Sequence, residues 1–371
     1  MIEILQFGLS ANRGGIETYL RKIWNNIDHT QFHFSFIDMT GEGQRPCFYE
    51  ELKASGCDFY KITPRNVSIL QNRRDIQRLF REKHFDIFHF NVNTLSYLLP
   101  VEEALKNGCK VLVHSRSSGA INSSRLTKAL HERNKRKLRK LDVTRIAVSQ
   151  MAGEWLFGGK AFVVYHNGVE TERFAFKEEN RKAVRTSLGC EGKKVIANVG
   201  AFMPAKNHRF MVEAFEALTA REPDAVLWFV GDGSLRPEME ALVKAKGLQD
   251  KILFLGSRRD LPELYAGMDL FWFPSLYEGY GNVLLEAQCE GVPCLLSDCI
   301  PQDARIADNT FAFSLEKSLD EWAQMLQIAL QAQKKDRTIC WQEMEDKGVS
   351  VKAEIQRLEA LYRSMLTKKE D

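Results

Sequence analysis

Two glutamates flank a glycine turn in residues 274–294, PSLYEGYGNVLLEAQCEGVPC. Glu278 precedes the turn, and Glu286 lies about one turn into a helix predicted to begin at Asn282. The first amides of a helix lack intrahelical acceptors and can bind an anionic diphosphate. Glu286 would then accept hydrogen bonds from sugar hydroxyls beside that diphosphate. The alternative is a solvated helix residue, which is less favourable on an otherwise apolar helical turn.

A lysine and a histidine follow other predicted strands. Lys206 lies in VGAFMPAKNHRF, after Gly200 and just before a predicted helix, where it is well placed to contact a phosphate. A lysine near a helix start is, however, more often solvated. His114 ends the predicted strand KVLVH and leads into the polar loop SRSSGAIN, where an active-site group is expected. A structural histidine is the alternative interpretation there.

Two more glycine-containing loops are candidate ligand sites. SANRGGIETYL places Gly15 at a predicted helix start, where the backbone can approach a ligand or simply turn into the helix. Asp232 in VGDGSLRPEM either contacts a ligand or stabilises its own turn, and the turn is the favoured interpretation. The first loop lacks the G-x-G-x-x-G spacing, which argues against a nicotinamide-dependent enzyme.

Short apolar runs alternate with helical patterns, which predicts doubly wound parallel sheets. The expected strands are residues 2–7, 32–37, 87–90, 110–114 and 145–147, and then 194–200, 225–231, 251–256, 270–274 and 293–298. Because the pattern restarts, we expect two α/β domains, 1–166 and 167–352, with the boundary at the Asn-Gly turn of VVYHNGVETERF. The last predicted helix, 353–366, could pack on either domain, including back on the first.

The composition excludes several classes of protein. A net charge of +3 implies no general attraction to nucleic acid. Eight cysteines without C-x-x-C pairs favour reduced thiols in a cytoplasmic protein. No signal-peptide pattern or membrane-spanning run is evident, so the chain is expected to be cytoplasmic, at most resting on the inner face of the membrane. No D-x-D or H-x-x-x-H cluster lies in a suitable loop, so neither a metal ion nor another cofactor is expected.

A basic amphipathic segment, SSRLTKALHERNKRKLRKLD, occupies residues 123–142. It carries eight Lys and Arg residues against one Glu and one Asp, and its leucines recur at helical spacing. Such a helix can rest on anionic lipid. The alternative is a solvated helix that packs its leucines on its own domain. The candidate membrane contacts are Arg125, Lys128, Lys135, Arg136 and Arg139.

The segment GDG…FLGSRRDLPELYAGMDLFWFPSLYEGYGNVLLEAQCEGVPCLLSD closely resembles glycosyltransferase family 4, which comprises retaining enzymes of GT-B fold. The two glutamates match the E-x7-E signature of that family, and VGAFMPAKN, HNGVETERF and GGIETYL are further matches. AVSQMAGEWLFG and FPSLYEG are most similar to bacterial capsular and exopolysaccharide enzymes. The resemblance spans nearly the whole chain, and it implies two Rossmann-like domains that face each other across a cleft.

The resemblance also implies a role for each matching residue. Glu286 would bind the ribose of the nucleotide, and Glu278 would contact the donor sugar. Lys206 would hold the diphosphate, and His114 would approach the donor sugar or the nucleophile, which makes Glu278, His114 and Lys206 the expected catalytic residues. The other implied donor-binding residues are Gly15, Gly200, Arg258, Gly281, Asn282 and Val283.

The activity implied by the resemblance is retaining transfer of a sugar from a nucleotide-diphosphate donor to a saccharide acceptor. The nucleotide would be UDP, and the acceptor could be lipid-linked, in bacterial surface polysaccharide synthesis. Ala201 stands where the family has an arginine, so one of two diphosphate cations is missing; Arg209 or Arg13 could replace it. Two alternatives follow: a catalytically silent nucleotide-sugar-binding subunit, or another GT-B enzyme such as a nucleotide-sugar epimerase.

Overall fold

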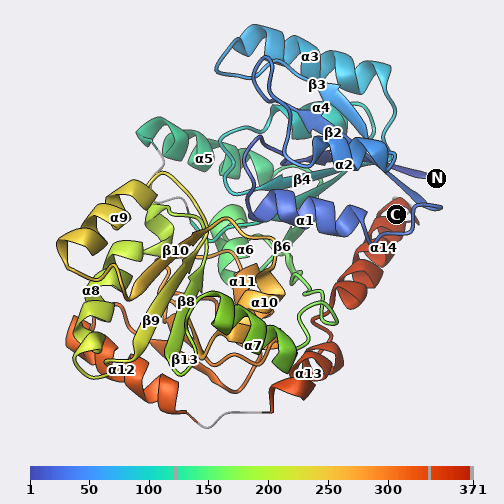
Figure 1. Ribbon diagram of the computed structural model, residues 1–371. Helices are drawn as coiled ribbons and strands as arrows, with labels where there is room; N and C mark the ends of the chain where they lie inside the picture. Colours follow the sequence, from blue (N-terminus) through green and yellow to red (C-terminus); the bar gives the residue numbers. More distant parts are fainter. Residues whose placement is uncertain (120–123, 333–335, 368–371) are drawn as a thin grey trace. The chain divides into compact units, whose positions relative to one another are not determined.

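The computed structural model of the chain describes residues 1–119, 124–332 and 336–367 (Figure 1). The chain forms two compact units. Unit 1 comprises Met1–His166 together with the terminal segment that begins at Val351, and unit 2 comprises Asn167–Ser350. Each unit has its own parallel sheet with helices between the strands. The predicted fold class, two Rossmann-like doubly wound domains, is therefore confirmed.

Unit 1 contains a seven-stranded parallel sheet with the order β3-β2-β1-β4-β5-β6-β7. Its strands are β1 (Ile2–Phe7), β2 (Phe32–Asp38), β3 (Asp58–Lys61), β4 (Ile87–Val92), β5 (Lys110–Ser115), β6 (Thr144–Ala147) and β7 (Val163–Val164). Its helices are α1 (Gly15–Trp24), α2 (Tyr49–Ala54), α3 (Ile69–Glu82), α4 (Leu99–Lys106), α5 (Arg125–Leu138), α6 (Gln150–Phe157) and α14 (Val351–Thr367). The strand order reverses between β1 and β4, so the connections diverge at this point.

Unit 2 contains a six-stranded parallel sheet with the order β10-β9-β8-β11-β12-β13, which reverses between β8 and β11. Its strands are β8 (Lys194–Val199), β9 (Ala225–Val230), β10 (Ile252–Gly256), β11 (Leu270–Phe273), β12 (Cys294–Ser297) and β13 (Thr310–Phe313). Its α-helices are α7 (Glu178–Ser187), α8 (His208–Thr219), α9 (Arg236–Ala245), α10 (Leu261–Gly267), α11 (Asn282–Cys289), α12 (Leu319–Gln331) and α13 (Cys340–Asp346). The described residues of this unit also form the 3₁₀ turns η1 (Pro204–Lys206), η2 (Gln302–Ala304) and η3 (Arg337–Ile339).

Helix α14 belongs to the core of unit 1, although it follows unit 2 in the sequence (Figure 1). Leu358 and Tyr362 on this helix are fully buried in one hydrophobic cluster with residues of β1, β2 and α1. Polar contacts also hold the helix in place. The Tyr165 hydroxyl donates to the Glu354 carbonyl oxygen (2.6 Å), and the Lys22 ammonium lies 2.7 Å from the buried Glu354 carboxylate.

The most consequential difference from the expected strands concerns β5. The prediction ended this strand at His114, but β5 continues to Ser115, because its pairing with β4 and β6 extends to that residue. His114 is therefore inside the sheet and fully buried rather than at the mouth of a loop. The short strands β3, β7 and β13 and the helices α2, α4, α6, α7, α12 and α13 were not expected.

A pair of leucine variants on α14 tests whether this helix is part of the unit 1 core. Leu358→Ala should lower the free energy of unfolding of unit 1 by about 2–5 kcal/mol, because it opens a cavity among fully buried side chains. Leu366→Ala, at a position that is 37% exposed on the same helix, should cost less than about 1 kcal/mol. Urea unfolding of both variants measures the difference, and equal losses would contradict the placement of α14.

Candidate functional site

The loops that follow β8 and β11 meet at the point where the strand order of unit 2 reverses. The Leu276 amide donates to the Ala205 carbonyl oxygen (2.8 Å), and the Asn207 side-chain amide donates to the Pro274 carbonyl oxygen (3.3 Å). Ligands of doubly wound proteins bind at this position, outside the carboxyl ends of the strands. The two loops therefore form the framework of a candidate site.

Lys206 and Glu278 form an ion pair between these loops. The Lys206 Nζ atom lies 2.5 Å from the Glu278 Oε1 atom, and the two side chains are 15% and 14% exposed. The Nζ atom also lies 4.8 Å from the centroid of the Phe273 ring, within the range of a cation–π contact. A methyl group added at Gly200 would lie 3.2 Å from Lys206 Cε, so this glycine leaves room for the lysine stem. The structure thus brings Gly200, Lys206 and Glu278 together.

Close backbone packing shapes the same end of the sheet. Gly231, which follows β9, has a φ of +143°, and a Cβ atom there would lie 2.1 Å from the Gly200 carbonyl oxygen. No side chain fits at that distance, so the loop after β9 requires glycine at this position. Gly281 also has a positive φ, +87°, directly before α11.

Helix α11 begins at this site with its amide groups. Its N-cap residue is Gly281, and an α-helix leaves its first N–H groups without intrahelical acceptors, here those of Asn282 and Val283. The Asn282 side chain does not cap the helix. Its Oδ1 atom instead accepts a hydrogen bond from Asn167 Nδ2 (2.6 Å), and the N-cap residue makes no side-chain cap bond. The amides suit an anion, as the sequence predicted.

Glu286 is positioned by a buried tyrosine that no sequence motif singles out. The Tyr265 hydroxyl lies 2.9 Å from Glu286 Oε2 and 3.0 Å from the Val283 carbonyl oxygen. Burial and the neighbouring Glu286 charge hold the pKa of Tyr265 well above its usual range, so the hydroxyl keeps its proton and acts as a donor. Glu286 is therefore a partly buried, oriented carboxylate rather than a solvated helix residue.

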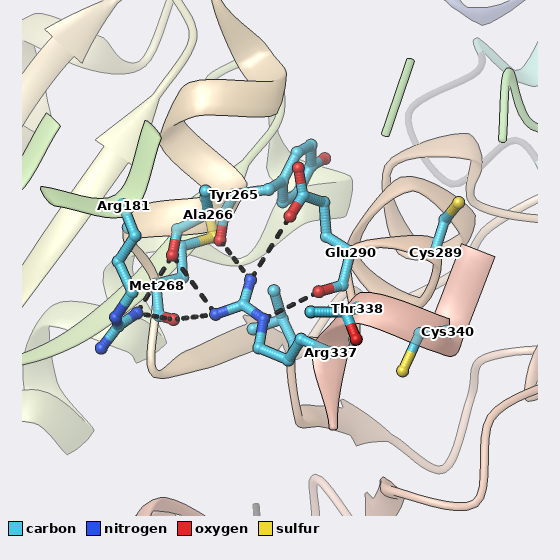
Figure 2. A network of polar contacts seen from close by, with 12 residues as sticks. Arg181, Tyr265, Ala266, Met268, Cys289, Glu290, Arg337, Thr338 and Cys340 are labelled. Carbon is cyan, nitrogen blue, oxygen red and sulfur yellow. Dashed lines mark hydrogen bonds and ion pairs between the residues drawn. The ribbon is translucent and has the colours of Figure 1, made fainter. Parts of the chain in front are cut away.

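Two arginines in turn hold the helix that carries Tyr265. Arg337 donates hydrogen bonds to the carbonyl oxygens of Tyr265, Ala266 and Met268 (3.0, 3.2 and 3.1 Å; Figure 2). Arg181 donates to the last two of these oxygens, at 3.0 Å each. These bonds satisfy carbonyl groups at the C-terminal end of α10, where no intrahelical donors remain. No local pattern connects the two arginines with α10, because they lie far from it in the sequence.

Two arginines predicted to contribute to the donor site are Arg209 and Arg258. Ala201 is exposed in the loop after β8. Arg209 on α8 lies 2.7 Å from the Glu238 carboxylate, an exposed ion pair that raises the pKa of Arg209. Arg258, which follows the edge strand β10, pairs with Asp260 through Nε (2.7 Å). Both guanidinium groups thus have a carboxylate partner.

The predicted site residues of unit 1 have different surroundings. Gly15 is the exposed first residue of α1, and a Cβ atom added to it would meet no heavy atom within 4 Å. His114 is fully buried, and both ring nitrogens have partners: Nδ1 lies 3.2 Å from His89 Nε2, and Nε2 lies 3.1 Å from Arg116 Nη1. Direct contact between His114 and a sugar is not supported by these surroundings. Residues 120–123 of the following loop lie outside the described residues.

The basic segment forms α5, and its candidate membrane contacts divide into two groups. The five residues are Arg125, Lys128, Lys135, Arg136 and Arg139. Lys135 is only 13% exposed and lies over the Trp155 ring (5.9 Å), and Arg139 donates to the Gly158 carbonyl oxygen. Arg139 is nevertheless exposed, as are the other three. His131 and Leu138 are buried whereas Leu126 is 69% exposed, so the helix packs on unit 1 from its middle onward but not at its first turn.

The described part of the chain contains neither a metal-binding cluster nor a membrane-spanning helix. Within residues 1–119, 124–332 and 336–367, no group of three His, Cys, Asp or Glu side chains could hold a metal ion. In the same ranges, no helix is both long and apolar enough to cross a membrane.

Residues 180–340, which include Lys206, Glu278 and Glu286, match the family Glycosyl transferases group 1. The matched segment lies within unit 2, and the two doubly wound parallel sheets are the architecture of a GT-B fold. Among curated proteins, the putative glycosyltransferase EpsF of Bacillus subtilis is 26% identical over 95% of this chain and 94% of its own length.

Two further comparisons support the class and the fold. A galactosyltransferase of Escherichia coli, UDP-Gal:alpha-D-GlcNAc-diphosphoundecaprenol alpha-1,3-galactosyltransferase, is 31% identical over 41% of each chain. The crystal structure of Anabaena Alr3699/HepE in complex with UDP-glucose covers 98% of this chain and 100% of that chain. Its TM-score is 0.80 at 19% sequence identity, so this likeness concerns the fold.

The network in Figure 2 generates a pH-dependent prediction. The Glu290 carboxyl group is fully buried; its nearest cation is Arg337 (3.6 Å), and its oxygens accept no hydrogen bond within the described residues. Burial raises the pKa of Glu290 to about 8, although Arg337 opposes the shift. As the pH rises from about 4.5 to 8, the unfolded chain releases this proton first, so the folded state loses stability.

Glu290→Gln should therefore stabilise the protein more at pH 8 than at about pH 5, by roughly 2–4 kcal/mol in the free energy of unfolding. Urea unfolding at both pH values measures this. Glu238→Gln, which removes an exposed carboxylate paired with Arg209, serves as the control and should show little pH-dependent difference. The prediction is wrong if the two variants have parallel pH profiles.

Proposed function

We propose that this chain transfers a sugar, with retention of configuration and without a metal ion, from a UDP-sugar to a saccharide acceptor in bacterial surface polysaccharide synthesis. The observation that carries the proposal is the Lys206–Glu278 pair at the strand-order reversal of unit 2, inside the matched domain. The names of similar proteins support it. HepE was crystallised with UDP-glucose, and the Escherichia coli relative acts on a sugar linked to diphosphoundecaprenol.

In this proposal, donor binding exchanges the partners of the ion pair. The diphosphate competes for the Lys206 ammonium, and Glu278 then accepts hydrogen bonds from hydroxyls of the donor sugar. The first amides of α11, at Gly281, Asn282 and Val283, bind the other phosphate oxygens. The site therefore offers preorganised positive charge where the nucleotide leaves as an anion.

The nucleoside end of the donor is assigned to Glu286. Tyr265 donates to one of its oxygens, which fixes the carboxylate toward the start of α11. We assign the ribose hydroxyls to this carboxylate, because a charged acceptor forms stronger hydrogen bonds than a neutral one. Arg258 is assigned to the base, as the family resemblance implies.

Lys206→Ala should lower kcat/KM for sugar transfer by about 10²–10³-fold, because the diphosphate loses its one lysine contact in this assignment. Glu278→Gln keeps the shape of the side chain but removes its negative charge, and it should lower kcat by about tenfold or more. Release of UDP from UDP-glucose, UDP-galactose and UDP-N-acetylglucosamine with a diphospho-undecaprenol-linked saccharide measures both. Addition of EDTA should leave the wild-type rate unchanged.

Lys194→Ala is the matched control, because Lys194 begins β8 at the opposite end of the same strand and also pairs with a glutamate, Glu222. Its kinetics should equal those of the wild type. If Lys206→Ala and Glu278→Gln also transfer at the wild-type rate, the assignment fails. Binding of UDP without any transfer or hydrolysis would instead identify the silent binding subunit suggested by Ala201, and donor turnover without an acceptor would identify an epimerase.

We further propose that α5 contacts anionic lipid, which suits a lipid-linked acceptor. Arg125, Lys128 and Arg136 are exposed, and the apolar side chain of Leu126 is exposed beside them. Each basic residue near an anionic surface contributes about 1 kcal/mol. The combined change of the three basic residues to Gln should therefore weaken binding to phosphatidylglycerol vesicles by about 100-fold in a flotation assay.

The control changes Arg73, Arg74 and Arg81 to Gln, because these arginines are exposed on α3 of the same unit. It removes the same charge from another helix and should bind vesicles as the wild type does. Flotation that is independent of the anionic lipid content would rule out the contact.

A further inference from the structure

Glu290 is a fully buried residue at the end of α11, the helix whose start is assigned to the diphosphate in the proposed function. It is the C-cap residue of this helix, where a negative charge is unfavourable because the helix dipole has its negative end there. Neither carboxyl oxygen has a hydrogen-bond partner among the residues that the structure describes. A buried carboxylate without such partners is costly, so this position favours the protonated acid.

Three arginines surround the C-terminal end of α10, and they differ in their carboxylate partners. Arg181 Nη2 lies 2.6 Å from Asp269 Oδ1, and Arg185 Nη1 lies 2.9 Å from Asp269 Oδ2. Arg337 instead faces Glu290, with 3.6 Å between Nη2 and Oε2 (Figure 2). That distance is too long for a hydrogen bond. Burial lowers the pKa of Arg337 to about 10, the direction expected for a guanidinium without a closely bound anion.

The Arg337 guanidinium has five N–H groups, and four of them donate to main-chain carbonyl oxygens. Nε donates to Glu290 (2.8 Å), Nη1 donates to Ala266 and Met268 (3.2 and 3.1 Å), and Nη2 donates to Tyr265 (3.0 Å). Within the described part of the chain, this leaves one N–H group of Nη2 for the Glu290 carboxyl group. One nitrogen atom therefore serves both the Tyr265 carbonyl oxygen and Glu290.

Tyr265 connects this cluster with Glu286, the carboxylate assigned to the ribose. Its hydroxyl donates to Glu286 Oε2 (2.9 Å), and its main-chain carbonyl oxygen accepts from Arg337. Glu286 and Glu290 are four residues apart, so they lie on the same face of α11. A displacement of Arg337, or of the end of α11, therefore reaches Glu286 through a single residue.

Glu290 changes its charge near pH 8, whereas two of its buried neighbours stay neutral. Burial raises the pKa of Glu290 to about 8, with the Arg337 charge opposing the shift. Burial also holds the pKa values of the Tyr265 hydroxyl and the Cys289 thiol well above their usual ranges. The charged and titratable side chains around Glu290 are Lys177 before α7, Glu263 and Tyr265 on α10, Cys289 on α11, Arg337 on η3 and Cys340 at the start of α13.

Ionisation of Glu290 draws the carboxylate and the Arg337 guanidinium together. Charge-assisted hydrogen bonds of this kind are about 2.7–2.9 Å long, so closing the present 3.6 Å separation requires a movement of roughly 0.7–0.9 Å. Movement of Nη2 lengthens its bond to the Tyr265 carbonyl oxygen, and movement of the carboxylate shifts the end of α11. Either movement displaces Tyr265 relative to Glu286. The new negative charge also lies on the helix assigned to the anionic donor, and it repels that ligand.

We propose that the proton on Glu290 controls nucleotide binding in unit 2. While the proton is present, Arg337 and Tyr265 hold Glu286 in position for the ribose. Release of the proton to water lets Arg337 move toward Glu290 and weakens binding of the UDP-sugar. The proposal rests on the proposed function in naming this ligand. Because linkage is reciprocal, binding of the UDP-sugar also makes Glu290 hold its proton more strongly.

The first test needs no ligand. In protein labelled with ¹³C at Cζ of tyrosine, each signal reports the hydrogen bond of one hydroxyl, and the Tyr265 signal is identified by its absence in Tyr265→Phe. This signal should move between about pH 6.5 and 9.5, with a midpoint near 8. In Glu290→Gln, which mimics the protonated acid, it should stay constant.

Tyr362 is the control for this titration, because it is a fully buried tyrosine of unit 1. Its signal should stay constant in the wild type and in Glu290→Gln. A constant Tyr265 signal in the wild type, or equal movement of that signal in Glu290→Gln, would overturn the proposal.

The second test measures binding of UDP-glucose, UDP-galactose and UDP-N-acetylglucosamine by calorimetry at about pH 7 and 9. UDP itself is avoided, because its terminal phosphate titrates close to this range. For the sugar that binds most tightly, the Kd of the wild type should be about fivefold higher at the higher pH. Glu290→Gln should have the Kd of the wild type at the lower pH under both conditions.

Two further variants separate the connection through Tyr265 from the charge itself. Tyr265→Phe keeps Glu290 but removes the bond to Glu286, so its Kd should be raised at both pH values and differ by less than about twofold between them. Glu238→Gln, which removes an exposed carboxylate of the same unit, should follow the wild type. The proposal is wrong if the wild-type Kd does not change with pH, or if Glu290→Gln or Tyr265→Phe changes as much as the wild type.

The outcomes also separate this proposal from the proposed function. Binding with the expected pH dependence, but without sugar transfer to any acceptor, would refute the transferase and leave the proton-linked site standing. Sugar transfer from a UDP-sugar whose Kd is independent of the Glu290 proton would refute the linkage alone. If no UDP-sugar binds at either pH, both fail.

Discussion

The strand order of each sheet reverses once, between β1 and β4 in unit 1 and between β8 and β11 in unit 2. The chain leaves the two central strands toward opposite faces of the sheet, so the loops there diverge and leave space above the strand ends. In unit 2 this space is bordered by the Lys206–Glu278 pair and the start of α11. In unit 1 it is a cavity whose lining includes Asn91. The polar chemistry of both units thus depends on one topological constraint.

The electrostatics of the unit 2 site rely on few charges held in defined positions. One lysine lies between a carboxylate and an aromatic face, and the amides of a helix start supply the remaining positive potential. Such a site gains from being partly buried, because interactions between charges strengthen as water is excluded. Behind it, Tyr265 and the two arginines of Figure 2 hold the helix positions that Glu286 requires. The ligand-facing groups are few, and the groups that position them are more numerous.

The sequence was sufficient to predict the elements that bury a continuous apolar run. The first strand was predicted as residues 2–7 and is observed as Ile2–Phe7. The short strands β3, β7 and β13 were not predicted because their residues are only partly buried, so they lack such a run. The site residues of unit 2 were visible as glycine turns and charged side chains at strand ends. The ion pair between Lys206 and Glu278 could not be predicted from the sequence. It forms because β8 and β11 are neighbours, which only the tertiary structure determines. Tyr265 and Asn91 resemble ordinary core residues in sequence. His114 was predicted to lie at a loop because the pairing of β5 with β4 extends one residue beyond the apolar run of β5.

Helix α14 has a consequence for the order in which the protein folds during synthesis. The ribosome makes residues 1–166 first, yet their hydrophobic cluster is completed by Leu358 and Tyr362, which emerge after all of unit 2. Unit 2 is a continuous segment and can fold as soon as it has left the exit tunnel. Unit 1 must wait with an incomplete core until α14 arrives, so the first half of the nascent chain is the part that most needs protection by chaperones.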